Sequence, residues 1–364
     1  MNTDTANITG PVDDLDLAFL RRCFRHHLAC DEIRILKLDK FPRGVSRETW
    51  FVSCELTSDE NITVQDFMLR RDLPGGSICS GDLRSEYEVY KRLNGSGVPV
   101  AETLWYEDDP ELLEGHREFY IRRHVQGDWN IPNLLDPDPA YNELRIAIGR
   151  EHVRCMAQLH SCDWQQLGFD EIFNVPDNAD DCARLRVEIL TAEIARLQVQ
   201  PLPLVTEAAE WFIDNQPPSS GHICLLKGTN GFGEEVFLDR KIVAMSDWEM
   251  ACLGDPAMDF AMAQNFLDEV HEDGKCLWGL QPALDYYHSL TGIHINPETI
   301  TYYKRLYGLN RIQFSQAAAR QLQMQDQLCR LPWLAVEVLH LGQIALANAI
   351  GCIKEPLPEM GQRG

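Results

Sequence analysis

Positive charge is scarce in this sequence of 364 residues. It contains 33 lysines and arginines against 56 aspartates and glutamates, so its formal net charge is −23. An acidic surface repels the phosphates of nucleic acids and of anionic lipids. The composition therefore argues against nucleic acid or a membrane surface as the main partner, and it is compatible with a cationic small molecule.

Long apolar runs and paired cysteine motifs are also missing. No stretch of 18 apolar residues occurs, which argues against a transmembrane helix. The opening residues, MNTDTANITGPVDDLD, lack the basic and apolar regions of a secretory signal. The twelve cysteines form no Cys-x-x-Cys pair, so a zinc knuckle is not expected. Free thiols without an export signal predict a cytoplasmic location.

What the first 125 residues do contain is a pattern of short strands around glycine and proline turns. Alternating apolar residues predict strands at residues 33–38, 49–52, 64–71 and 118–125. A helix is predicted over 83–94, because Asp82 can cap it and its apolar residues share one face. We therefore expect an antiparallel sheet with one inserted helix, after a short amphipathic helix at 17–30.

Beyond residue 140 the pattern becomes helical. Apolar spacing predicts helices at residues 141–160, 183–197, 204–214, 298–325 and 333–350, with a β-rich island at 222–247. The fold class expected is α+β. It comprises a loose tail (1–16), a β-rich N-lobe (17–125) and a mainly helical C-lobe (126–364).

The segment DWEMACLGDPAMDF, residues 247–260, is the most informative stretch. Asp247 follows an apolar strand, so its carboxylate would project from the end of a sheet. One or two such oxygens can hold Mg²⁺ beside the phosphates of a nucleotide. The alternative is an ordinary turn in which Asp255 and Pro256 begin a helix. Spacing alone leaves both interpretations open.

This segment resembles the metal-binding segment of the aminoglycoside phosphotransferase/choline kinase-like family. It is especially similar to the subgroup associated with acyl-CoA dehydrogenases, whose pattern reads roughly D-W-E-x-A-x-x-G-D-P-x-x-D-L-A. The resemblance covers about residues 30–265. It implies a bilobal protein-kinase-like fold that binds ATP and Mg²⁺ and phosphorylates a hydroxyl group of a small molecule, from simple alcohols to hydroxyacyl thioesters.

The N-lobe carries further parts of the family pattern. The run FPRGVSRETW, residues 41–50, resembles the nucleotide loop G-G-x-S-N-x-T-Y, with one glycine and the asparagine missing. MLRR, residues 68–71, resembles the strand whose basic residue pairs with phosphate, and a helix glutamate pairs with that base. The resemblance thus assigns nucleotide binding to Gly44, Ser46, Arg70 and Glu86, and to a hinge around Arg123 and Val125.

The catalytic loop departs from the family. Its pattern is H-G-D-x-x-x-x-N, with the aspartate 18 residues before the D-W-E aspartate, which places Thr229 at the catalytic position. Lys227 then stands for the histidine and Glu234 for the metal-binding asparagine, while the glycine is kept. We expect Glu234 and Asp247 to hold the metal. Lys227 would offset anionic charge, and Glu235 is a candidate displaced base.

Two functions from different classes remain open. A threonine hydroxyl is no general base at neutral pH, but losing such a base costs about 10²–10⁴-fold and need not abolish transfer. The first hypothesis is therefore an ATP- and Mg²⁺-dependent phosphotransferase. The alternative is a kinase-fold protein that does not phosphorylate, either a pseudokinase or an enzyme whose loop at 227–235 performs other chemistry. The glycines at 228, 231 and 233 also allow an anion-binding loop or a plain turn.

Overall fold

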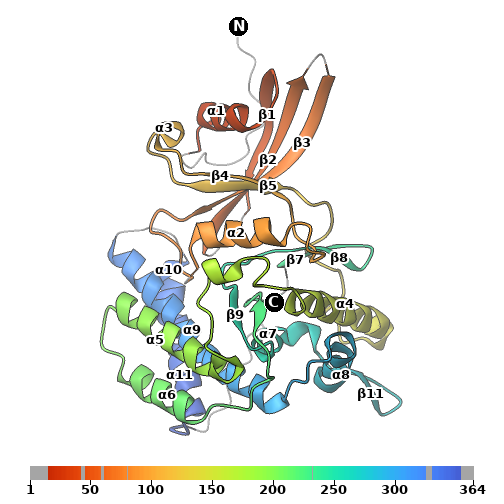
Figure 1. Ribbon diagram of the computed structural model, residues 1–364, viewed down its shortest axis with the longest axis vertical. Helices are drawn as coiled ribbons and strands as arrows, with labels where there is room; N and C mark the ends of the chain where they lie inside the picture. Colours follow the sequence, from red (N-terminus) through yellow and green to blue (C-terminus); the bar gives the residue numbers. More distant parts are fainter. Residues whose placement is uncertain are drawn as a thin grey trace.

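The computed structural model describes residues 15–41, 46–58, 61–79, 81–231, 233–324 and 330–353. The chain forms a small sheet-containing part and a larger helical part, with helix α2 lying between them (Figure 1). The expected α+β, bilobal architecture is confirmed. Of the predicted loose tail, residues 1–14 lie outside the described residues, and Leu15 is buried.

The N-lobe sheet has five antiparallel strands in the order β1-β2-β3-β5-β4. The strands are β1 (Glu32–Lys40), β2 (Arg47–Ser58), β3 (Asn61–Asp72), β4 (Thr103–Glu107) and β5 (Phe119–Arg123). Because side chains alternate along a strand, Phe67 and Leu69 of β3 are buried under α1 while Met68 and Arg70 face the opposite side. That opposite side faces the C-lobe, where a ligand can enter.

Three helices complete the N-lobe. Helix α1 (Leu17–His27), capped by Asp16, packs its apolar stripe on the sheet, and the short α3 (Pro110–Leu113) lies near it. Helix α2 (Leu83–Leu93) begins at Asp82, whose side chain accepts a hydrogen bond from the Ser85 amide at 2.6 Å, as predicted. An apolar cluster joins α2 to the C-lobe and includes Tyr90, Leu93, Leu159 and Trp248.

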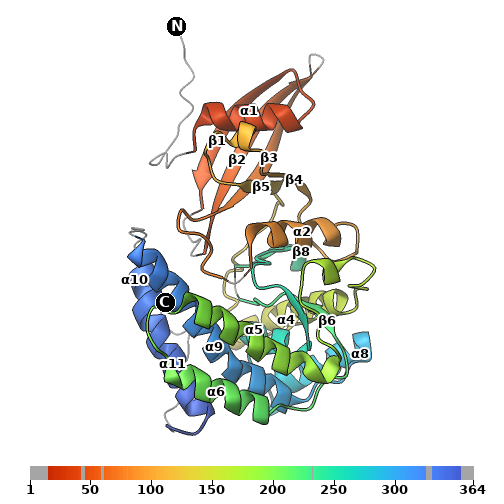
Figure 2. The same ribbon diagram turned by 60° about the vertical axis from the view of Figure 1, so that its left-hand side comes forward.

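The C-lobe is built from helices. They are α4 (Asn142–His160), α5 (Cys182–Leu197), α6 (Pro203–Asp214), α7 (Ala257–Met262), α8 (Leu280–Thr291), α9 (Pro297–Gln323), α10 (Leu331–Trp333) and α11 (Leu339–Ala349). A π-helical turn, Leu334–Val338, links the last two, and 3₁₀ turns occur at Pro139–Tyr141, Phe169–Glu171, Ala179–Asp181 and Gln264–Phe266. Helices α5, α6, α9 and α11 lie alongside one another (Figure 2). No helix within the described ranges is long and apolar enough to cross a membrane.

The predicted β-rich island is resolved into separate antiparallel pairs. Strand β6 (Cys224–Leu226) pairs with β9 (Cys252–Gly254), and β7 (Glu235–Leu238) pairs with β8 (Lys241–Met245). A further hairpin, β10 (Val270–Glu272) and β11 (Lys275–Trp278), follows. The loops after β6 and after β8 therefore emerge side by side, which brings Thr229 next to Asp247 although 18 residues separate them.

Candidate active site

A pocket of 720 Å³ lies between the sheet and the C-lobe. Strands β1, β2 and β3 line it on one side, and the residues before β7 and after β8 line it on the other. The lining includes four basic side chains: Lys37, Lys40, Arg70 and Arg122. Apolar groups line the remainder, among them Phe41, Phe51, Met68, Val125 and Trp129. Basic groups beside an apolar slot suit the phosphates and base of a nucleotide.

Arg70 is the central cation of this pocket. Its Nε atom lies 2.9 Å from Oε1 of Glu86 on helix α2, and Nη2 lies 2.7 Å from Oδ1 of Asp247. Nη1 donates to the Thr49 hydroxyl at 2.9 Å. Burial acts to raise the pKa of Glu86, but Arg70 and then Arg47 outweigh it and hold that pKa below its ordinary value. The predicted pairing of Arg70 with Glu86 is therefore present.

A second arginine, Arg47, supports the same glutamate. It is fully buried, and its guanidinium bonds Glu86 at 2.6 Å, Asp72 at 2.7 Å and the carbonyl of Gly81. Buried charges persist when they are paired and hydrogen-bonded in this way. Arg47 lies within the run at residues 41–50 that resembles the nucleotide loop, and the pairing of β2 with β3 brings it to Asp72.

Asp247 connects the pocket to the catalytic loop. Its backbone is left-handed, with φ of 68°, at the point where the chain turns out of β8. Its carbonyl accepts a hydrogen bond from the Thr229 hydroxyl at 2.8 Å, while its carboxylate is held by Arg70. Thr229 thus acts on the backbone of Asp247.

Glu249 is a site residue to which the sequence analysis gave no role. Its buried carboxylate accepts hydrogen bonds from the Ser46 hydroxyl at 2.5 Å, the Cys79 thiol at 3.1 Å and Arg70 at 3.3 Å. Burial first, and then the charge of Asp247, raise the pKa of Glu249 to about 7. Ser46 therefore lines the pocket with its hydroxyl directed at Glu249.

Lys227 holds the loop at residues 227–235 by contacts with several of its members. Its buried ammonium donates to the Thr229 carbonyl at 2.7 Å and to Oε2 of Glu234 at 2.5 Å, and it lies 3.5 Å from Oε1 of Glu235. Burial alone would lower the pKa of Lys227, but Glu234 and Glu235 raise it above its usual range. Lys227 is therefore a permanent countercharge to these glutamates.

The two glutamates occupy different environments. The Glu234 side chain is 20% exposed and lines the pocket, whereas the Glu235 side chain has no exposed surface. Burial raises the pKa of Glu235 to about 8. Near it lies His152, which is fully buried and stacks on the Phe266 ring. Burial lowers the pKa of His152 to about 3. In this arrangement Glu235 faces Lys227 and the core, away from the pocket.

Asp259 fixes the backbone of the loop. Its Oδ2 accepts the amide of Lys227 at 2.9 Å, and its Oδ1 accepts the amide of Gly228 at 2.8 Å. His160 contacts Asp259 at 3.1 Å and the Tyr287 hydroxyl at 2.9 Å. His160 is thus a buried structural histidine that orients the aspartate, and the aspartate in turn sets the loop.

The acidic groups around the pocket fit a divalent cation. Burial first, and then the charge of Asp247, raise the pKa of both Glu234 and Glu249, so these carboxylates repel one another, and Lys227, Arg70 and Arg47 offset that repulsion in part. Carboxylate oxygens are the ligands that Mg²⁺ prefers, usually with phosphate oxygens and water completing its shell. Within the described ranges no group of three or more His, Cys, Asp or Glu could hold a metal alone. Glu234 and Asp247 thus fit a metal that arrives with a nucleotide.

The remaining predicted nucleotide-binding residues have different placements. Val125 lines the pocket, as the predicted hinge requires. Arg123 does not line it, because its guanidinium turns to Gln65 and to Glu102 at 3.6 Å on the outer side of the sheet. Gly44 lies outside the described residues.

The neighbouring Arg122 lines the pocket instead and was missed. Its guanidinium lies 5.3 Å from the ring centroid of Tyr90, a cation–π contact. The strict alternation of β5 was the available signal, since adjacent arginines on a strand must face opposite sides. Lys37, Lys40 and Trp129 were also missed, because nothing in the linear sequence brings β1 to the segment after β5.

This geometry matches a known family. The family model described as the phosphotransferase enzyme family matches residues 37–276. The chain belongs to this family. The family assignment agrees with the resemblance found in the sequence, and it rests on a match to most of the chain.

Relatives of this phosphotransferase-family chain include much longer proteins. Acyl-CoA dehydrogenase family member 11 of Mus musculus is 27% identical over 271 residues, covering 72% of this chain and 32% of that protein. The Gallus gallus protein of the same name is 30% identical over 185 residues, 50% of this chain and 22% of that protein. The chain thus matches about a third or less of the length of these relatives.

Solved structures share the fold. A structure from Ralstonia eutropha that is described as an aminoglycoside phosphotransferase has a TM-score of 0.63 at 19% sequence identity. The match covers 92% of this chain and 98% of that one. Macrolide 2'-phosphotransferase MphH from Brachybacterium faecium has a TM-score of 0.53 at 16% identity, covering 94% and 99%. The complex of APH(2″)-IIa with streptomycin and ATP has a TM-score of 0.50 at 14% identity, covering 82% and 91%.

Proposed function

We propose that this chain is an ATP-dependent phosphotransferase that acts on a hydroxyl group of a small molecule. The observation that carries the proposal is the ion-pair chain from Glu86 through Arg70 to Asp247, which crosses from the N-lobe to the C-lobe at the wall of the pocket. A phosphate-pairing cation and a metal-binding carboxylate are the parts that phosphoryl transfer needs in this position.

In this proposal each side of the pocket has a separate task. The apolar slot with Val125, Phe51 and Met68 takes the adenine, and Arg70 pairs with the phosphates. Asp247 and Glu234 hold Mg²⁺, which when bound neutralises charge on the phosphates. Lys227 keeps Glu234 in place and compensates Glu235.

The transfer itself makes modest demands on the protein. The acceptor hydroxyl oxygen forms a bond to the γ-phosphorus of ATP while the bond to the bridging oxygen breaks, which yields ADP and a phosphate monoester. In a loose transition state the attacking oxygen changes charge little, so its proton can leave late to a phosphoryl oxygen or to water. Thr229 positions the Asp247 backbone in this scheme, and the absence of a base there predicts slow turnover.

Two observations favour two different classes of acceptor. The matched relatives are named as acyl-CoA dehydrogenases, which favours a hydroxyacyl thioester as the acceptor. The net charge of −23 favours a cationic molecule instead. An acceptor screen should therefore contain hydroxyacyl thioesters and hydroxylated amines, with ATP consumption as the readout.

The direct test combines binding with turnover. Purified protein is titrated with ATP, with and without Mg²⁺, and a ligand at 100 times its Kd should stabilise by about 2.7 kcal/mol, a melting-temperature shift of roughly a few degrees. The Mg²⁺-dependent part of the shift, and ADP formation, should be lost in Asp247→Asn. Unchanged ATP-dependent activity in that variant would overturn the proposal.

A second candidate is a kinase-fold protein that does not phosphorylate. The observation that favours it is the loss of the catalytic base, since Thr229 donates to a backbone carbonyl and Glu235 is buried. This candidate predicts an ATP shift without any ADP formation across the acceptor screen. Absence of any nucleotide shift would direct the search to other chemistry at residues 227–235.

A further inference from the structure

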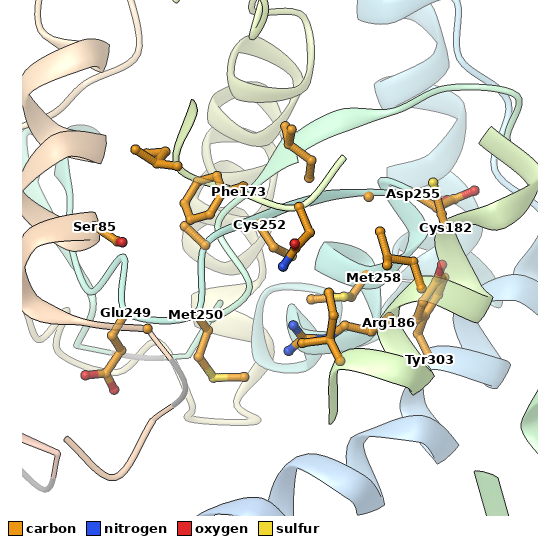
Figure 3. A pocket seen from close by; sticks show the side chains of 18 of the residues that line it. Ser85, Phe173, Cys182, Arg186, Glu249, Met250, Cys252, Asp255, Met258 and Tyr303 are labelled. Atoms are coloured by element: carbon orange, nitrogen blue, oxygen red, sulfur yellow. The ribbon is translucent and has the colours of Figure 1, made fainter. Parts of the chain in front are cut away.

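A second pocket, of 240 Å³, lies beside the first along the segment that follows Asp247. Its walls come from helix α5, helix α9, strand β9 and the residues around Phe173 (Figure 3). Glu249 lines both pockets, so they share one stretch of backbone. The interior surface is mainly apolar and includes Phe173, Ile189, Met250 and Met258.

Arg186 of helix α5 brings a charge into this pocket. Its side chain stands among the lining groups in Figure 3, and the residue is only 8% exposed. Within the described part of the chain its Nε and Nη2 atoms have no hydrogen-bond partner, and no carboxylate forms an ion pair with it. By contrast, the buried Arg47 and Arg71 are both held by carboxylates.

The described neighbours of Arg186 have other partners or are neutral, so none of them pairs with its guanidinium. Burial raises the pKa of Cys252 and raises that of Cys182 to about 12, so both thiols are neutral at physiological pH. The Asp255 carboxylate accepts the amides of Ser220 and Ala257, each at 2.8 Å. Glu249 is engaged by Arg70, Ser46 and Cys79 on its other side.

A buried guanidinium without a partner is costly, so its presence at a pocket indicates a bound anion. The charge of the lining selects among anions. The lining contains one arginine and three acidic side chains, those of Asp82, Glu249 and Asp255. Because these carboxylates repel negative charge, a doubly charged phosphate is disfavoured. The sulfur and aromatic walls favour an apolar body on the ligand.

We propose that this pocket binds a small monocarboxylic acid, with Arg186 holding the carboxylate and the apolar walls holding its chain. The site is distinct from the nucleotide pocket, and the inference does not depend on phosphoryl transfer. A carboxylate on the acceptor and one on a separate effector share this chemistry. They are distinguished by whether a hydroxylated acid is consumed together with ATP.

The test measures binding of acetate, butyrate and hexanoate by calorimetry at constant ionic strength, with hexanamide as the neutral counterpart. We expect hexanoate to bind and hexanamide to bind about tenfold or more weakly, because the charged hydrogen bonds are lost. Affinity should rise along the series by up to about fourfold per CH₂. Equal binding of hexanoate and hexanamide would overturn the proposal, as would no binding of either.

Matched variants locate the site. Arg186→Met should abolish the preference for hexanoate, and its melting temperature should equal or exceed that of the wild type because an unpaired buried charge has been removed. Arg184→Met is the control, since Arg184 lies on the same helix, pairs with Asp181 and Glu188, and does not line the pocket. It should leave hexanoate binding unchanged.

A third variant covers the case in which Arg186→Met does not fold. Met258→Glu places a carboxylate inside the pocket, where it would pair with Arg186 and exclude hexanoate. Hexanoate binding that persists with unchanged affinity in folded Arg186→Met or Met258→Glu protein would overturn the assignment. The nucleotide shift with ATP is recorded in parallel, so failure of this site and failure of the proposed function give different results.

Discussion

Nη2 of Arg70 lies 2.7 Å from Oδ1 of Asp247, and this contact joins strand β3 to the turn after β8. The two groups that would receive phosphate and metal therefore neutralise each other in the absence of ligand. A nucleotide with Mg²⁺ can replace this contact on both sides at once, giving Arg70 a phosphate and Asp247 a cation. Without a ligand, the positive charge of Arg70 and the negative charge of Asp247 therefore balance each other.

The first prediction concerns Arg70. Replacing it in Arg70→Met should weaken ATP binding about 10- to 100-fold, because a charge-assisted contact is lost, while Glu86 keeps Arg47 and Tyr120 as partners. Thermal-shift titration with ATP measures this. Arg123→Met is the matched control, since that arginine turns away from the pocket and should leave ATP affinity unchanged. Equal losses in both variants would contradict the assignment of Arg70.

The second prediction concerns the missing base. In Thr229→Asp a carboxylate would lie beside Lys227, whose Nζ is 3.1 Å from the present hydroxyl, so its charge would be compensated. ATP turnover with an accepted substrate should rise by about 10²-fold or more. Thr229→Asn has similar size without a base and should show no gain. If neither variant turns over ATP with any acceptor, the non-phosphorylating alternative is favoured.

The third prediction is a pH dependence of stability carried by Glu249. Its pKa is raised to about 7 in the folded protein, so the folded state holds a proton that the unfolded state releases. The contribution of Glu249 to the free energy of unfolding should therefore fall by about 1–3 kcal/mol as the pH rises from about 4.5 to 7.

Glu249→Gln tests this assignment. Its melting temperature should fall less than that of the wild type across that window. A wild-type and variant pair with parallel pH profiles would show that Glu249 does not titrate there. Added Mg²⁺ with ATP should partly flatten the wild-type profile, because burial raises this pKa most and a cation beside Asp247 relieves the repulsion that adds to it.

The fourth prediction concerns the glycine that the loop retains. Gly228 has φ of 79°, and a Cβ there would run into the carbonyl of Met250. Gly228→Ala should therefore lower both stability and activity. Gly233→Ala is the control, because Gly233 has a similar φ of 89° and its nearest neighbour, Trp129, leaves room for a methyl group. It should cost only the backbone preference of about 1–2 kcal/mol. Chemical denaturation of both variants measures the difference, and equal effects would contradict it.

Much of the architecture was determined by local sequence. The Asp82 cap, the apolar face of α2 and the alternation of β1, β2, β3 and β5 each depend on residues a few positions apart, so periodicity and capping predicted them. Strand β4, helix α8 and the hairpin of β10 and β11 were missed. These elements are short or weakly patterned, and packing on the rest of the chain stabilises them.

The candidate site was determined partly by the sequence and partly by the tertiary structure. The family resemblance predicted roles for Arg70, Glu86 and Asp247 and the replacement at Thr229, because the family's patterns are carried within single segments. Tertiary structure alone decided that Thr229 bonds the Asp247 carbonyl and that Glu235 is buried, and it decided which of the two alternating arginines, Arg122, faces the pocket. It also buried the Nε and Nη2 atoms of Arg186 with no hydrogen-bond partner among the described residues. Burial and pairing depend on contacts between distant segments, and the linear sequence does not encode them locally.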